Sequence, residues 1–205
     1  MTLKRQSSPK RKLLAAARAA RSHLPGGLPP VLFLTDPSRT PDPVATAKRL
    51  PAGWGVIYRH FDAADAAGTA RTLARICRER GLCFLIAADP LLAMATGADG
   101  VHWPHAKVAA SRKWQSRFVL MTASAHSPEE LRMLTRYPVD AALVSAVFAS
   151  NSPSARAPLG ALRLRTMARA SACPVFALGG VSAENAAQVA SFSGIAGVDV
   201  LTQVF

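Results

Sequence analysis

The sequence predicts an α/β protein with the architecture of a compact (β/α)8 barrel, or TIM barrel, preceded by an N-terminal helix. Three observations support this fold class. Eight short apolar segments rich in β-branched residues recur along the 205-residue chain, as expected for parallel strands covered on both faces. Segments with helical periodicity separate them. The chain length suits one domain at the small end of the range for this fold.

The eight expected strands all lie after residue 30. Their ranges are 31–35, 54–59, 83–88, 99–103, 118–123, 140–145, 174–179 and 197–202. Because the last range ends three residues before Phe205, the helix that would follow the eighth strand is expected to be missing or replaced. The N-terminal helix could then cover the exposed side of the barrel. An open, doubly wound sheet is the alternative arrangement.

Three segments between the strands carry clear helix signals. Residues 65–81 place an apolar stripe on one face and end at Gly81, a residue type favoured just after a helix. Ser127 and Pro128 suit the N-cap and the first position of a helix. Ser182 is expected to cap a third helix, which follows the seventh strand.

The chain divides into a basic N-terminal segment with an amphipathic helix, residues 1–28, and a barrel, residues 29–205. The helix is expected over residues 11–23. The first 24 residues hold seven Lys and Arg and no acidic residue, within a net charge of +13. This alanine-rich segment does not resemble a secretory signal, although an organelle transit peptide remains an alternative. Its charge also suggests association with nucleic acid or acidic membranes, as a third class of function.

Other bulk features exclude several classes of protein. No apolar run approaches the roughly 20 residues of a membrane-spanning helix, so no membrane span is predicted. No nucleic-acid-binding motif is present, so no specific nucleic-acid partner is expected. The three cysteines have no metal-ligand spacing and fit reduced thiols in a cytoplasmic protein. A homodimer is one assembly that the sequence allows.

Polar residues follow the expected strands at the barrel end where enzymes of this fold place their chemistry. Asp36 and Asp89 both precede proline and have alternative roles in a turn or a helix cap. His102 and His126 also have structural alternatives. Arg59 ends a buried strand and therefore needs a partner or an anionic ligand. The full set is Asp36, Arg59, His60, Asp89, His102, His105, Ser124, His126, Ser145, Gly179, Gly180, Thr202 and Gln203.

The glycine pair after the seventh strand is the more specific signal. Gly179 and Gly180 stand between an apolar strand and the expected helix capped by Ser182. Backbone N–H groups at such a junction can bind an anion. In TIM barrels, the loops after strands 7 and 8 commonly hold a substrate phosphate. Plain tight turns are the alternative.

These motifs, in this order, resemble the thiamine phosphate synthase and TenI family of barrels. The resemblance runs from LFLTD to GVDVLT and includes TGADGVHW, SAHSPEEL and FALGGVSAENA. It implies a thiazole phosphate bound over the loops after strands 7 and 8. In the synthase branch, a pyrimidine diphosphate held by magnesium and basic residues is joined to that thiazole. In the TenI branch, a histidine after strand 5 carries a proton while a thiazole carboxylate phosphate is isomerised.

Compared with the synthase pattern, the diphosphate and metal groups are largely lost. Of the strand-2 motif Gln-x-Arg-x-Lys, only Arg59 is present. Asp89 matches one magnesium carboxylate, but Lys107 stands where the second is expected, so a Mg²⁺ cofactor has an incomplete site. Pro153 replaces a lysine of the diphosphate loop.

The thiazole phosphate half of the family pattern is retained. The resemblance implies TenI-like proton transfer, with His126 as acid and base and with Ser124 and Arg59 positioning the substrate. A small phosphorylated heterocycle would be bound by Gly179, Gly180, Thr202, His102, Ser150 and Ser152. Two alternatives remain open: an active thiamine phosphate synthase, and a non-catalytic binder or regulator that recognises a phosphorylated ligand.

Overall fold

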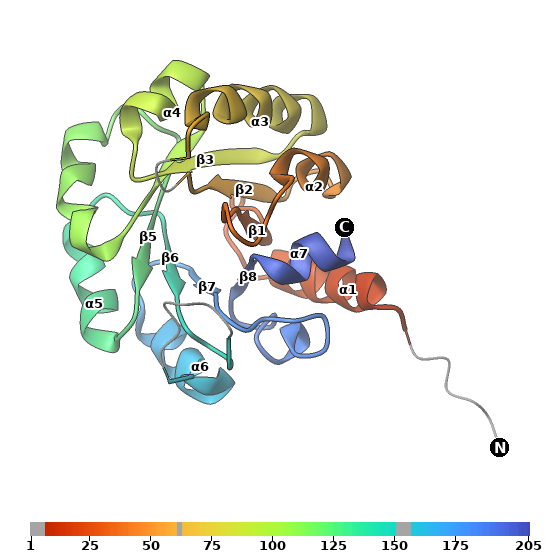
Figure 1. Ribbon diagram of the computed structural model, residues 1–205. Coiled ribbons are helices and arrows are strands. Elements are labelled where there is room, and N and C mark those ends of the chain that lie inside the picture. Colours follow the sequence, from red (N-terminus) through yellow and green to blue (C-terminus); the bar gives the residue numbers. More distant parts are fainter. Residues whose placement is uncertain (1–6, 61–62, 151–156) are drawn as a thin grey trace.

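The computed structural model describes residues 7–60, 63–150 and 157–205 and contains a closed barrel of eight parallel strands. The strands follow one another in sequence order, and β1 pairs with both β2 and β8 (Figure 1). This closure confirms the (β/α)8 barrel and excludes the open sheet. The strands are β1 (Val31–Leu34), β2 (Gly55–Tyr58), β3 (Cys83–Ala87), β4 (Gly100–Trp103), β5 (Leu120–Ala125), β6 (Ala141–Val144), β7 (Val175–Ala177) and β8 (Gly194–Gly197).

Helices surround the barrel, and local sequence signals account for most of their starting points. At five helices, a Ser or Asp side chain accepts a hydrogen bond from the backbone N–H three residues later: α1, α2, α3, α4 and α5. The helices are α1 (Pro9–Arg21), α2 (Pro43–Arg49), α3 (Ala66–Arg80), α4 (Pro90–Thr96), α5 (Pro128–Met133), α6 (Gly160–Ala170) and α7 (Asp199–Val204), with 3-10 turns η1 (His105–Trp114), η2 (Leu134–Arg136) and η3 (Ala186–Gln188).

Apolar side chains fill the barrel interior and the layer between strands and helices. Successive strand residues point to opposite faces, so Leu32 and Leu34 belong to one buried cluster while Phe33 belongs to the other. The interior cluster also contains Ile57, Leu85, Leu143 and Phe176. The interior of the barrel is therefore filled by side chains.

The N-terminal helix is part of the barrel wall. Leu13, Ala16, Ala17 and Ala20 of α1 are buried, and the helix packs against β8 and η3. Figure 1 shows α1 on the side of the barrel occupied by β8 and α7. Arg21 holds the end of α1 in place by donating to the carbonyl oxygens of Leu28 at 2.6 Å and Gly53 at 3.0 Å. The expectation that this helix covers the barrel near strand 8 is confirmed.

The eighth strand does not occupy the expected range. It spans Gly194–Gly197, whereas most of the expected strand, residues 197–202, forms α7. A short helix therefore follows strand 8, contrary to the expectation that it is missing. Periodicity cannot separate a short buried strand from a short buried helix. Gly194 allows β8 to lie close to β7, since a Cβ at this position would collide with the ring of Phe176.

The expected helix after strand 7 is reduced to a single 3-10 turn. Ser182 does act as a cap, because its hydroxyl accepts from the N–H groups of Glu184 and Asn185. Only Ala186–Gln188 is helical, however. This turn packs against α1. Among the described residues, no helix is long and apolar enough to cross a membrane.

Candidate functional site

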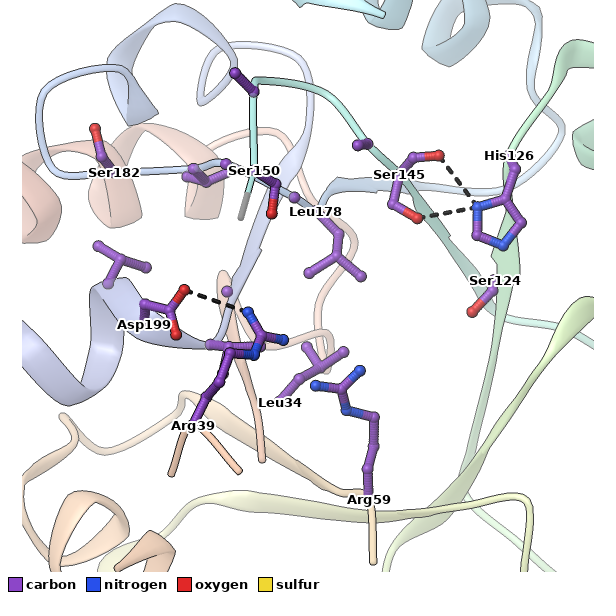
Figure 2. A pocket seen from close by; sticks show the side chains of 18 of the residues that line it. Leu34, Arg39, Arg59, Ser124, His126, Ser145, Ser150, Leu178, Ser182 and Asp199 are labelled. Carbon is purple, nitrogen blue, oxygen red and sulfur yellow. Dashed lines mark hydrogen bonds and ion pairs between the residues drawn. The ribbon is translucent and has the colours of Figure 1, made fainter. Parts of the chain in front are cut away.

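A cavity of about 410 Å³ lies at the C-terminal ends of the strands. Figure 2 shows that its side chains come from several strand ends and converge on one space. The residues of its wall lie at or just after the ends of β1, β2, β4, β5, β6, β7 and β8 and at the start of α7. Polar and glycine residues in the wall are Arg39, Arg59, His102, Ser124, His126, Ser145, Ser150, Gly179, Gly180, Ser182, Gly197, Asp199 and Gln203.

Two arginines share one carboxylate beside this cavity. Asp36 Oδ2 accepts from Arg39 at 3.2 Å and from Arg59 at 3.3 Å. Arg59 Nε also donates to the carbonyl oxygen of Thr35 at 2.7 Å. Burial lowers the pKa of Arg59 to about 10, although Asp36 opposes this shift. Arg59 therefore stays protonated at neutral pH.

Asp36 is more than a turn residue. Burial alone would raise the pKa of its carboxyl group, but hydrogen bonds from Ser38 and Arg39 outweigh burial and lower that pKa below the usual value. Its other oxygen, Oδ1, accepts from the N–H and the hydroxyl of Ser38. A carboxylate fixed at both oxygens holds the two guanidinium groups in place next to the cavity.

His102 is buried, with 4% of its surface exposed, and both ring nitrogens are engaged. Nδ1 lies 2.9 Å from the hydroxyl of Thr122, and Nε2 lies 2.9 Å from the hydroxyl of Ser124. Burial, with a smaller contribution from the charge of Arg59, lowers the pKa of His102 to about 3. This ring is neutral at physiological pH, and its contacts position Ser124.

His126 lies at the junction between β5 and α5. Its backbone N–H donates to Glu130 Oε2 at 2.7 Å, which fixes the residue just before the capped start of the helix. Its Nδ1 lies 3.1 Å from the carbonyl oxygen of Ser145. Nδ1 also lies 3.1 Å from the hydroxyl of Ser145, which can donate or accept. In the neutral tautomer with the proton on Nδ1, that nitrogen donates to the carbonyl oxygen and Nε2 is left as an acceptor. In Figure 2, the second ring nitrogen lies on the side away from Ser145.

Open backbone N–H groups line the opposite part of the cavity. Gly179 and Gly180 have φ values of +87° and +66°, a region that favours glycine. A Cβ on Gly180 would also collide with the carbonyl oxygens of Phe148 and Ala149. Within the described part of the chain, the N–H groups of Gly179, Gly180, Asp199 and Val200 have no hydrogen-bond partner. These N–H groups can therefore donate hydrogen bonds to a bound anion.

The remaining predicted binding residues divide into three cases. Ser150 lines the cavity, whereas Ser152 lies outside the described residues. Thr202 was placed after strand 8, but it lies on α7, where its hydroxyl donates to the carbonyl oxygen of Asp199 at 2.9 Å. It does not line the cavity, and Gln203 of the same helix does. The shift of strand 8 accounts for this difference.

Asp89 does not form a metal site with other described residues. One of its oxygens caps α4 by accepting from the N–H of Leu92 at 2.9 Å, and the other lies 3.9 Å from His60 Nε2. Within residues 7–60, 63–150 and 157–205, no group of three or more His, Cys, Asp or Glu side chains could hold a metal ion.

Two charged residues of the cavity are absent from the sequence-based set. Arg39 lies in the loop between β1 and α2, and it forms an ion pair with Asp199 on α7 at 3.3 Å. Neither stands at an expected strand end, and Asp199 falls inside the segment that was expected to be strand 8. The sequence signal is that Arg39 lies three residues after the motif LTD and that Asp199 lies within the motif GVDVLT.

The fold and the cavity define a TIM-barrel protein that combines a glycine loop, two arginines and a histidine–serine pair. The family model described as thiamine monophosphate synthase (TMP-TENI) matches residues 32–204, and the chain belongs to this family. It is 31% identical over 144 residues to the thiamine-phosphate synthase of Latilactobacillus sakei subsp. sakei, covering 66% of this chain and 62% of the relative. It is 33% identical over 138 residues to the thiamine-phosphate synthase of Chlorobium luteolum, covering 66% of this chain and 65% of the relative.

The matched region is longer in another relative. The thiamine-phosphate synthase of Herpetosiphon aurantiacus is 30% identical over 166 residues, covering 78% of this chain and 80% of the relative. Among solved structures, thiamine phosphate pyrophosphorylase from Pyrococcus furiosus aligns with a TM-score of 0.72 and 20% identity, covering 85% of this chain and 91% of that one. At this identity, the structural likeness shows the fold alone.

Proposed function

We propose that this protein binds the phosphate monoester of a thiazole and transfers a proton on the ring system, as in the TenI branch of its family. The observation that carries this proposal is the shared cavity. His126 and Ser124 line the same space of about 410 Å³ as the glycine loop and the two arginines. The glycine loop and the arginines suit a phosphate, and His126 and Ser124 suit a ring that exchanges a proton. A ligand with a phosphate at one end and a ring at the other therefore fits this cavity.

The phosphate would be held at the glycine loop and the start of α7. Backbone N–H groups of Gly179, Gly180, Asp199 and Val200 are open donors there within the described residues. Arg59 supplies a fixed positive charge at the same cavity. Oriented N–H groups combined with a guanidinium are the usual means of binding a phosphate oxygen.

The proton transfer would be carried out by His126. With Nδ1 protonated and bonded to Ser145, Nε2 can take a proton from one carbon of the ring system. The resulting imidazolium would return a proton at another carbon, so no group is lost or gained. Ser124, held by the neutral ring of His102, would orient the ring or its substituent.

The charge balance of the cavity favours a monoester over a diphosphate. The positive charges of Arg39 and Arg59 are offset by Asp36 and Asp199. A diphosphate leaving group needs its growing charge neutralised as the bond breaks, usually by metal ions and basic side chains. In the described part of the chain, no group of three or more His, Cys, Asp or Glu side chains could hold a metal ion, and both arginines at the cavity are already paired with carboxylates.

Synthase activity is the second candidate. It is favoured by the relatives, because those from L. sakei, C. luteolum and H. aurantiacus all bear the name thiamine-phosphate synthase. The two candidates are separated by incubating the protein with either substrate set. Isomerisation of a thiazole carboxylate phosphate without formation of thiamine phosphate supports proton transfer. Thiamine phosphate formed from the pyrimidine diphosphate, thiazole phosphate and Mg²⁺ would contradict it. Binding without either reaction would identify a binder or regulator.

Replacement of Gly180 by alanine is expected to weaken thiazole phosphate binding about tenfold or more. The new Cβ would force the loop away from Phe148 and Ala149 and displace the N–H donors. Titration calorimetry measures the change in Kd, and circular dichroism shows whether the barrel still folds. Gly160→Ala is a matched control, because Gly160 also has a positive φ, of +77°, but has open space around it. Equal Kd values for Gly180→Ala and wild type would contradict the placement of the phosphate.

A further inference from the structure

We infer that Arg39 is a further phosphate-binding residue and that Asp199 is its counter-ion in the ligand-free protein, so that an incoming phosphate displaces Asp199 from Arg39. The inference rests on the proposed phosphate site at the glycine loop and α7. It adds a specificity element to that site, formed by two residues that lie 160 positions apart in the sequence.

The contacts of Arg39 leave it ready to bind a further anion. Its NH2 group donates to Asp36 at 3.2 Å, and its NH1 group donates to Asp199 at 3.3 Å. Its Nε is buried and has no hydrogen-bond partner among the described residues. A buried guanidinium nitrogen without a partner is costly, and a ligand oxygen in the cavity could satisfy it. Figure 2 shows the guanidinium groups of Arg39 and Arg59 near each other and directed into the cavity.

The two carboxylates around Arg39 differ in how firmly they are held. Asp36 is 15% exposed in its side chain and is bonded at both oxygens. The Asp199 side chain is 49% exposed and, within the described residues, its carboxylate contacts only Arg39. Exposed ion pairs contribute little to stability. The bond to Asp199 is therefore the one that a ligand can break, while Asp36 keeps the guanidinium in position.

The location of Asp199 makes it a competitor of the ligand. It is the first residue of α7, and its own backbone N–H is one of the open donors of the proposed phosphate site. A phosphate bound at that N–H would lie beside the Asp199 carboxylate, and like charges at this range repel. Transfer of Arg39 from Asp199 to the phosphate removes this conflict, because the exposed carboxylate can then turn to solvent. A guanidinium can bind two phosphate oxygens at once.

Competition for Arg39 predicts a specific pattern of affinities for phosphate. Asp199→Asn is expected to lower the Kd for inorganic phosphate about five- to tenfold, since it removes the competing charge while keeping the shape of the side chain. Arg39→Gln is expected to raise that Kd about tenfold. In the Arg39→Gln background, Asp199→Asn should change the Kd by less than twofold, because no guanidinium remains for which Asp199 and phosphate could compete. A purely structural role for either residue would not produce tighter binding in Asp199→Asn.

The experiment is a double-mutant cycle in which isothermal titration calorimetry measures Kd for inorganic phosphate and for thiazole phosphate on the full chain. Glu184→Gln and Arg49→Gln are matched controls at exposed positions, and neither residue lines the cavity. Thermal unfolding confirms that each variant is folded. If Arg39→Gln proves unstable, Arg39→Lys takes its place in the cycle. This variant keeps the charge but not the bidentate fork and should therefore retain part of the affinity.

The outcomes separate this inference from the proposed function. Equal tightening by Asp199→Asn in both backgrounds would show simple repulsion and overturn the competition. Unchanged affinity in both Arg39→Gln and Arg39→Lys, combined with weakened binding in Gly180→Ala, would overturn the role of Arg39 and leave the phosphate site intact. If neither probe binds to wild type or to Asp199→Asn, the phosphate site itself is wrong and the inference falls with it.

Discussion

Replacing His126 with glutamine is expected to lower kcat for proton transfer on the thiazole ring by a factor of about 10²–10⁴, the usual contribution of a general acid–base residue. Glutamine can still donate a hydrogen bond to the carbonyl oxygen of Ser145, the partner of Nδ1 in the wild type. It cannot, however, take up a proton as Nε2 does. The ligand should therefore still bind, with a Kd within about twofold of wild type, while chemistry is lost.

Hydrogen exchange at the substrate provides the direct measurement for His126. In D₂O, wild-type protein should incorporate deuterium into the thiazole carboxylate phosphate, and nuclear magnetic resonance follows the loss of the proton signal. His105→Gln is a suitable control, because His105 also approaches Glu130, at 4.0 Å, but does not line the cavity. Deuterium exchange at the wild-type rate in His126→Gln would contradict the role of His126 as proton carrier. Exchange lost together with ligand binding would instead indicate a structural role.

Acidification is expected to destabilise the protein through His102, the second large effect. Burial lowers the pKa of His102 to about 3 in the folded protein, against about 6.5 in an unfolded chain. Below pH 6.5 the unfolded chain binds a proton that the folded protein does not. The stability that arises from the neutral ring is therefore complete above pH 6.5 and falls as the pH drops toward 3. At about 1.4 kcal/mol per pH unit, the loss between pH 6.5 and 4 is roughly 3 kcal/mol.

Urea unfolding at a series of pH values measures this loss for His102. In His102→Gln, the free energy of unfolding should fall less steeply between pH 6.5 and 4, by about one proton per molecule. The comparison concerns the slope, so it holds even if the variant is less stable overall. His23→Gln serves as the control, because it also replaces a histidine by glutamine, at an exposed position that does not line the cavity. Identical slopes for wild type and His102→Gln would refute the assignment.

The positions of seven strands and of the caps follow from local sequence patterns. Ser127, for example, caps α5 as expected, because an N-cap depends on a side chain and a backbone N–H three residues apart. The polar residues after β2 and β5, namely Arg59, Ser124 and His126, line the cavity as their strand-end positions predict. Parallel strands in a barrel bring such residues together whatever their distance in the sequence.

His102 illustrates why position at a strand end does not establish a role. The sequence places it among the substrate-binding residues, and it does line the cavity, but its two ring nitrogens contact the hydroxyls of Thr122 and Ser124 on the neighbouring strand. The register of β4 against β5, which pairs His102 with Thr122, determines this contact. Register between strands is set by the closure of the whole barrel, so it cannot be read from residues 99–103 alone.

By itself, the sequence determined the barrel class, the family resemblance and the half of the site built from strand ends and the glycine loop, because these depend on local periodicity and short motifs. Only the tertiary structure decided that residues 199–204 form a helix and that Arg39 meets Asp199. A short apolar segment becomes strand or helix according to what packs on it. An ion pair between distant residues exists only once the closed barrel has brought their loops to the same rim.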